Sequence, residues 1–104
     1  MSATLYILET QGQAKDGIGL QASAVDISLI INKQAIVSSS SSVPSSKFNQ
    51  MTHLIRLWAD GDGYIEFGPN PTATTSSIPI AAKTAEYFAV SLPDGIKVAF
   101  LSAA

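Results

Sequence analysis

The chain has 104 residues, which fits one domain with a thin core, because a chain of this size buries only somewhat more than about 60% of its unfolded surface. Only 13% of the residues are charged, about half the ~25% typical of soluble domains, which predicts that much surface is buried in an assembly. A net charge of −2 without a basic cluster weighs against nucleic-acid binding, and the absence of cysteine excludes disulfides and cysteine-based zinc sites. No signal peptide is visible, and no apolar run approaches the ~20 residues that cross a bilayer.

The first third of the chain predicts short strands joined by polar segments. Residues 3–9 alternate and predict the first strand, whereas residues 10–19 are polar and carry three glycines, which predicts a loop or arm. Residues 21–31 alternate clearly at their core, which predicts a strand with one buried face. Asn32 and Lys33 are then expected to form a tight turn into residues 34–37.

A run of five serines follows, within a polar segment at about 38–46. One interpretation of such a run is a solvated, mobile loop. The other is an extended edge segment that pairs with a neighbouring subunit. On the second interpretation the candidate assembly contacts are Ser38, Ser39, Ser40, Ser41 and Ser42.

Residues 47–59 fit two periodicities. Helical spacing is nearly met by Phe48, Met51, Ile55 and Trp58. Ser45 or Ser46 could cap the start of such a helix, and Gly61 could end it. Residues 52–59 also alternate as a strand does, and an Asp-Gly pair at 60–61 between two apolar runs is a hairpin signal. We therefore favour a strand over a helix, followed by a hairpin turn at 60–63.

The C-terminal half has the clearest strand pattern, with strands expected at 64–67, 77–81, 84–90 and 96–101. Pro79 has no N–H to donate, which places the second of these strands at a sheet edge. In total the sequence predicts an all-β fold, a small β-sandwich or jelly-roll-like single domain (residues 1–104) of about seven or eight short antiparallel strands. The candidate core residues are Ile65, Phe67, Phe88, Val98 and Phe100.

Few residues could carry catalysis or hold a metal. His53 is the only histidine, and we interpret it as a strand residue rather than part of a triad or metal site. Asp60, Asp62 and Glu66 form the only acidic cluster, but their spacing does not match a calcium-binding loop, so we interpret them as solvated carboxylates near a turn. The sequence therefore predicts no catalytic residue, no metal site and no cofactor.

Several short motifs follow one another between Leu54 and Phe100. They are RLWAD at 56–60, IEFG at 65–68, NPTAT at 70–74, IPIA at 78–81, EYFAV at 86–90 and GIKVAF at 95–100. This series resembles small virion structural proteins of tailed bacteriophages, and the likeness covers about half the chain. The N-terminal half carries no such resemblance.

The resemblance implies a non-enzymatic β module, most directly a capsid decoration or cement protein that binds the major capsid protein and stabilises the head. A head-fibre base or a tail component is the alternative within the same class. The implied partners are copies of the chain itself, as a dimer or trimer, and the major capsid protein, with no nucleic acid and no membrane. The implied location is the capsid surface of the virion, after synthesis in the host cytoplasm.

A function of another class stays open, a carbohydrate-binding or glycosidase-like jelly roll. Such a protein would need a platform of exposed aromatic side chains for the sugar. Hydrolysis would in addition need a suitably placed pair of carboxylates.

Overall fold

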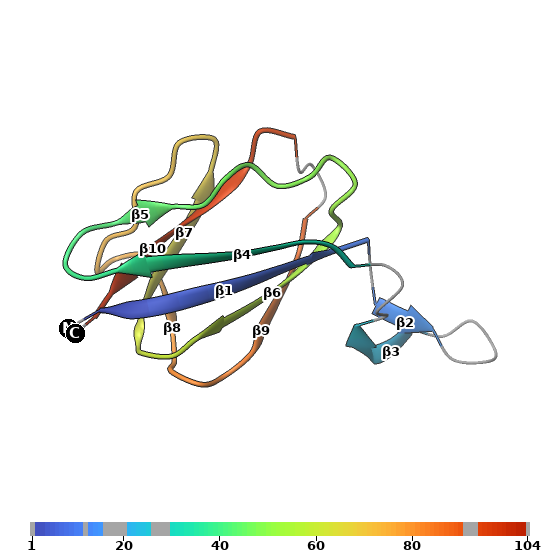
Figure 1. Cartoon of the computed structure of the whole chain (residues 1–104), viewed down its shortest axis with the longest axis horizontal. Coiled ribbons are helices and arrows are strands. Elements are labelled where there is room, and N and C mark those ends of the chain that lie inside the picture. The colour runs from blue at the N-terminus through green and yellow to red at the C-terminus, as the bar shows by residue number, and fades with distance from the viewer. Residues whose placement is uncertain (1, 12, 16–20, 26–29, 91–93, 104) are drawn as a thin grey trace.

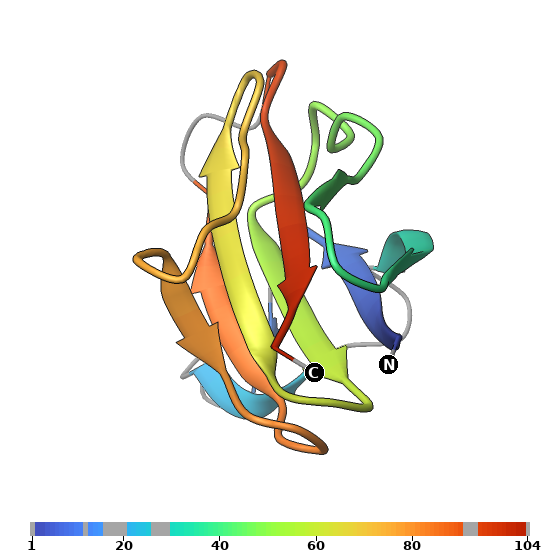
Figure 2. The same cartoon turned by 90° about the vertical axis from the view of Figure 1, so that its left-hand side faces the viewer.

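Two four-stranded sheets pack face to face around one core and form a small antiparallel β-sandwich (Figure 1, Figure 2). The computed structural model describes residues 2–11, 13–15, 21–25, 30–90 and 94–103, and no helix occurs among them. The all-β, single-domain sandwich predicted from the sequence is therefore confirmed.

Strands far apart in the sequence lie side by side in each sheet. The first sheet has the order β4 (Ile30–Ser38), β1 (Ala3–Thr10), β6 (Leu54–Ala59) and β9 (Glu86–Ala89). The second has the order β5 (Val43–Pro44), β10 (Lys97–Ser102), β7 (Gly63–Gly68) and β8 (Ile78–Ile80). Two further strands, β2 (Gln13–Lys15) and β3 (Gln21–Val25), pair with each other at one end of the sandwich (Figure 1). The connections β4–β5, β5–β6 and β6–β7 each pass from one sheet to the other.

Alternation along the strands builds the core. On β1 the side chains of Leu5 and Ile7 are buried, whereas Tyr6 between them is exposed. The buried cluster contains Ala3, Leu5, Ile7, Phe48, Ile55, Leu57, Ala59, Ile65, Ile80, Val98 and Phe100. Both sheets and the segment before β6 thus contribute to one apolar layer.

The candidate core residues lie on or beside this cluster. Ile65, Val98 and Phe100 are fully buried. Phe67 and Phe88 are only partly buried and pack against the cluster, with their ring centroids 5.2 Å apart. Phe88 lies on β9, an edge strand, which leaves one side of its ring accessible.

The turn at 60–63 joins the two sheets, so the predicted hairpin between the flanking strands is wrong. β6 belongs to the first sheet and β7 to the second. Asp60 stays beside β1, because its N–H donates to Thr4 O (3.1 Å) and its Oδ1 accepts from Thr4 N–H (2.7 Å). Gly63 permits the passage, since a Cβ there would lie 2.4 Å from Cε1 of Phe100. An Asp-Gly pair signals a sharp turn, but only packing decides which sheet the next strand joins.

β4 runs unbroken through Asn32 and Lys33, so the predicted tight turn there is also wrong. Both residues pair with β1, opposite Glu9 and Leu8. The ladder with β1 therefore overrides the local turn preference. Of the strand predicted at 21–31, residues 21–25 form β3 and 30–31 begin β4, while 26–29 lie outside the described residues.

The polar segment at 38–46 is part of the sandwich rather than a loose arm. Ser38 is fully buried, and its hydroxyl accepts from the N–H of Ser102 in the opposite sheet (2.9 Å). The hydroxyl of Ser45 likewise accepts from a β10 N–H (3.0 Å). Of the predicted assembly contacts, Ser38 and Ser42 thus make bonds within the chain, and only Ser39, Ser40 and Ser41 are exposed.

The other sequence predictions are met in part. The strand favoured within 47–59 is confirmed for 54–59, which form β6, whereas 45–53 are irregular. Pro79 lies in β8, whose only partner is β7, so the predicted edge position is confirmed. Gly95 has a φ of +76°, as a turn glycine does, while Pro93 lies outside the described residues. The predicted arm at 10–19 contains β2 at 13–15, and positions 12 and 16–19 also lie outside them.

We expect the replacement Phe100→Ala to lower the free energy of unfolding by about 3–5 kcal/mol, because the ring is fully buried and would leave a cavity. Phe88→Ala should cost about half as much, since the ring is partly exposed and its neighbours can relax. Chemical denaturation of both variants measures the difference. Equal losses would mean that the β9 edge is buried more deeply than the structure shows.

Candidate functional site

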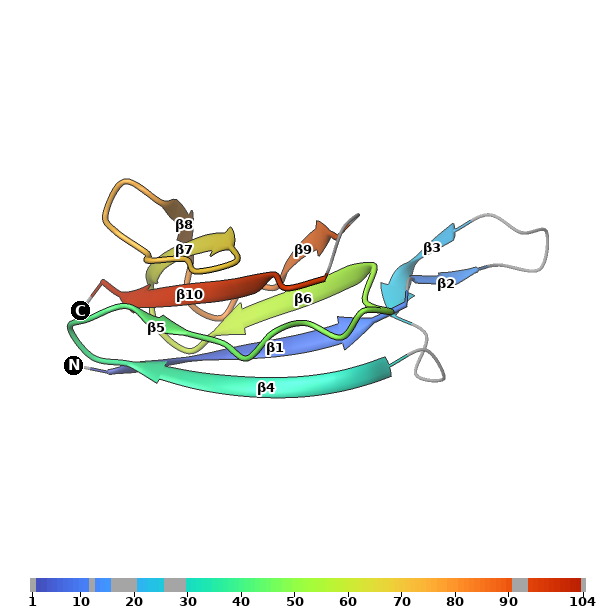
Figure 3. The same ribbon diagram turned by 90° about the horizontal axis from the view of Figure 1, so that it is seen from above.

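The outward side of the first sheet forms a surface that no other described segment covers (Figure 3). Strand register arranges its side chains in rows, one of which is Lys33, Leu8, Arg56 and Tyr87 and the next Ala35, Tyr6 and Trp58. We call the following set the aromatic face: Thr4, Tyr6, Leu8, Lys33, Ala35, Val37, Arg56, Trp58 and Tyr87.

Exposed apolar side chains are concentrated on the aromatic face. Tyr6 is 47% exposed, Val37 58% and Tyr87 43%, and they are three of the five large apolar side chains that stand exposed in the described part of the chain. The rings of Tyr6 and Trp58 lie with centroids 5.8 Å apart at an angle of 48°. Contiguous apolar surface of this kind marks an interaction site more often than scattered single residues do.

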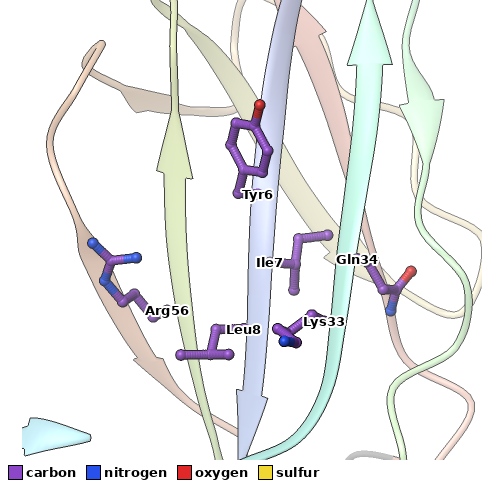
Figure 4. Close-up of a pocket in the computed structure, with 6 residues that line it drawn as sticks. All are labelled: Tyr6, Ile7, Leu8, Lys33, Gln34 and Arg56. Atoms are coloured by element: carbon purple, nitrogen blue, oxygen red, sulfur yellow. The ribbon is translucent and has the colours of Figure 1, made fainter.

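Two cations flank the apolar side chains. Lys33 and Arg56 lie on either side of Leu8 and line a shallow hollow with it (Figure 4). Neither cation forms an ion pair or hydrogen bond with another described residue. The two rows through Tyr6 and Leu8 contain no carboxylate, whereas Asp60 lies beside Thr4 in the next row. The face is therefore apolar, with two cations beside Leu8 and one carboxylate at its Thr4 end.

The acidic cluster predicted from the sequence is dispersed in the structure. Oδ1 of Asp60 accepts from Thr4 N–H, Oδ1 of Asp62 accepts from Ala82 N–H (2.7 Å), and Oε1 of Glu66 accepts from the Ser77 hydroxyl (2.9 Å). Each carboxylate holds a different turn or strand end. Among the described residues, no group of three or more His, Asp or Glu side chains is placed to hold a metal ion.

His53 extends the first sheet through its backbone hydrogen bonds. It is exposed and precedes β6 directly. Its N–H donates to Thr10 O (2.9 Å), and its carbonyl accepts from Val90 N–H (2.8 Å). The backbone of His53 thus extends the ladders on both sides of β6.

A second hollow lies at the open edge between the sheets. It is lined by Asp62, Tyr64, Pro79, Ile80, Ala81 and Glu86. Two carboxylates and one aromatic ring could contact a sugar there. Asp62 is already bonded to the backbone after β8, however, which leaves Glu86 as the carboxylate without a described partner.

Glu9 is the one fully buried carboxyl group of the described chain, and the sequence interpretation missed it. Its Oε2 accepts from Asn32 Nδ2 (3.0 Å) and Gln34 Nε2 (2.9 Å), both on β4. Its Oε1 accepts from Asn49 N–H (2.7 Å) and the Thr52 hydroxyl (2.9 Å). A carboxylate offers about four acceptor positions, so this group has none left for a substrate.

The two missed features had unequal signals in the sequence. Glu9 shares the inward side of β1 with Leu5 and Ile7, and that alternation could have identified it as a buried carboxyl. The aromatic face depends on Tyr6 meeting Trp58 across two strands that are about fifty residues apart. No local pattern specifies that pairing.

No protein-family model matches this chain, and neither a curated protein nor a solved structure matches it. The described part of the chain also holds no helix that is long and apolar enough to cross a membrane. The fold and the aromatic face define the chain as a small β-sandwich with one uncovered, aromatic sheet face.

We expect the replacement Glu9→Gln to lower the free energy of unfolding by about 1–3 kcal/mol, although the two side chains have nearly the same shape. The NH₂ group of the new amide would replace one carboxylate oxygen and would face N–H or O–H donors there. If the Gln34 amide flipped so that its oxygen accepted from this NH₂ group, the bonds between Gln34 and Ser46 would break. The matched control is Glu86→Gln, an exposed position where we expect a change within about 0.5 kcal/mol. Chemical denaturation that gives equal stability for both variants would contradict the structural role of Glu9.

Proposed function

We propose that the chain is a non-enzymatic structural protein of a tailed-bacteriophage virion, a capsid decoration protein that binds the major capsid protein through the aromatic face. The observation that carries the proposal is the concentration of exposed Tyr6, Val37 and Tyr87 on one sheet face. Covering such a face contributes about 25 cal/mol for each Å² of apolar surface removed from water. Repetition over many identical capsid sites would turn a modest affinity per copy into a stabilised shell.

The motif series between Leu54 and Phe100 supports the choice of a virion protein. In the sandwich this half of the chain supplies β6 to β10, which include Arg56, Trp58 and Tyr87 of the aromatic face. The low charge of the sequence also favours a protein whose surface is largely covered in an assembly.

The absence of an enzymatic role is part of the proposal. Its support is that the four acceptor positions of Glu9 are all occupied, so this buried carboxyl group has none free to act as a general acid or base. Asp60, Asp62 and Glu66 each hold a different turn or strand end through one oxygen.

A carbohydrate-binding function is the second candidate, and one observation favours it. Three aromatic side chains, Tyr6, Trp58 and Tyr87, share the uncovered face, as a sugar platform requires. The rings of Tyr6 and Trp58 are inclined by 48°, however, so they do not form one plane for stacking. We therefore rank protein binding above sugar binding.

To test capsid binding, the purified chain is mixed with capsids of the encoding phage that lack it, and the bound fraction is measured after sedimentation. We expect wild-type protein to sediment with capsids and Tyr6→Ala with Tyr87→Ala to weaken binding about tenfold or more, as loss of central aromatic contacts does. Ile78→Ala, an exposed apolar position on the other sheet, is the matched control and should bind as wild type does. Sedimentation with purified tails but not with capsids would assign the chain to a tail or fibre instead.

A glycan array addresses the second candidate with the same variants. We expect the wild-type chain to show no saturable binding to any glycan. Saturable binding that is lost with Tyr6→Ala and Tyr87→Ala, together with no binding to capsids, would replace the virion proposal by a carbohydrate-binding one.

A further inference from the structure

The four sheet edges of the sandwich differ in how well they are protected. β5 has two residues and contains Pro44, β8 has three and contains Pro79, and β9 has four. β4 has nine residues, contains no proline and pairs on one side only, with β1. Figure 3 shows no described segment beyond β4 on its free side. Short strands and prolines protect edges from pairing, so β4 is the edge left open to another strand.

The backbone groups that β4 presents can be derived from its neighbour. Thr4 N–H donates to the Oδ1 of Asp60 and Thr4 O accepts from Asp60 N–H, while Thr10 O accepts from His53 N–H. These β1 residues therefore direct their backbone groups toward β6 and away from β4. Because the direction alternates along a strand, Leu5 and Ile7 direct theirs toward β4 and bond with their partners Ile36 and Gln34. On β4 the residues between these, Lys33, Ala35 and Val37, therefore direct their N–H and C=O groups to the free side.

We propose that the free edge of β4 binds the β4 edge of a second copy of this chain, antiparallel and with a two-fold axis at Ala35. In this register Ala35 lies opposite its own counterpart, and Lys33 lies opposite Val37 of the second copy. All three residues with free backbone groups then pair, which gives about six main-chain hydrogen bonds.

The side chains on this edge fit that register. Ala35 is small and leaves room at the axis, where two side chains meet directly. Val37 is the most exposed large apolar side chain of the described chain, at 58%, and the aliphatic stem of Lys33 can cover it across the new ladder. The two lysines stay apart, whereas a register centred on Lys33 would place like charges directly opposite each other.

This pairing would join the two first sheets into one continuous sheet of eight strands. Their aromatic faces would then lie side by side, because the paired strands keep the same side outward. The inference does not rest on the proposed capsid function, since it concerns the strand edge and holds whatever the aromatic face binds.

Sedimentation velocity of the full chain tests the pairing. The concentration should run from about 10 μM to about 1 mM, because an interface made by one pair of strands is small and is expected to bind weakly. We expect a monomer–dimer equilibrium whose dissociation constant rises about tenfold or more in Val37→Lys, which places a lysine opposite Lys33 of the second copy. Ala35→Pro should act similarly, since it removes an N–H on the free side without touching the β1 ladder. Ile78→Lys makes the same chemical change on the β8 edge and should leave the dimer unchanged.

Amide hydrogen exchange gives a second measurement that does not depend on any variant folding. In wild-type protein the amides of Lys33, Ala35 and Val37 should become protected as concentration rises, while those of Gln34 and Ile36 are protected throughout by β1. A folded chain that stays monomeric at about 1 mM would overturn the proposal. So would a dimer that is as sensitive to Ile78→Lys as to Val37→Lys, or one in which the three free-side amides still exchange rapidly.

Discussion

The buried carboxyl group of Glu9 joins β1 to β4 and to the irregular segment that carries the chain from β5 to β6. Burial of a carboxyl group without partners is costly, and here four donors compensate for the lost water. Because two of the donors, Asn49 and Thr52, lie just before β6, the bonds fix where that strand enters the first sheet. From that point β6 pairs with β1 on one side and with β9 on the other.

Neutral polar groups meet the same requirement elsewhere in the sandwich. The hydroxyl of Ser38 on β4 accepts from the Ser102 N–H on β10 and so bonds the first sheet to the second. The hydroxyl of Ser45 accepts from the Val98 N–H and holds the chain after β5 beside β10 within the second sheet. Every buried side-chain oxygen or nitrogen of the described chain has a hydrogen-bond partner. This explains how a chain with few charges and many serines can form a specific core, since hydroxyls and amides supply the directional bonds.

The two surfaces that we propose bind other molecules both belong to the first sheet. Its outward side is apolar with two cations, and its β4 edge presents backbone groups without a partner. The edge strands of the second sheet, β5 and β8, are short and contain prolines. The carboxylate of Glu66 on β7 accepts a hydrogen bond from the Ser77 hydroxyl. The two surfaces share Lys33, Ala35 and Val37 at the β4 margin of the aromatic face, so β4 pairing would cover that margin and leave Tyr6, Trp58 and Tyr87 for another partner.

The sequence by itself determined the all-β class, the strands at 3–9, 64–67 and 96–101 in outline, and the edge position of Pro79, because period-two alternation and the missing proline N–H are local properties. It also indicated Ile65, Val98 and Phe100 as inward-facing residues. Only the tertiary structure decided that the turn at 60–63 crosses between sheets, that β4 continues through Asn32 and Lys33, and that Ser38 is buried. The physical reason is that pairing partners lie about fifty residues apart, so that neither turn propensity nor alternation specifies which strand fills the neighbouring position.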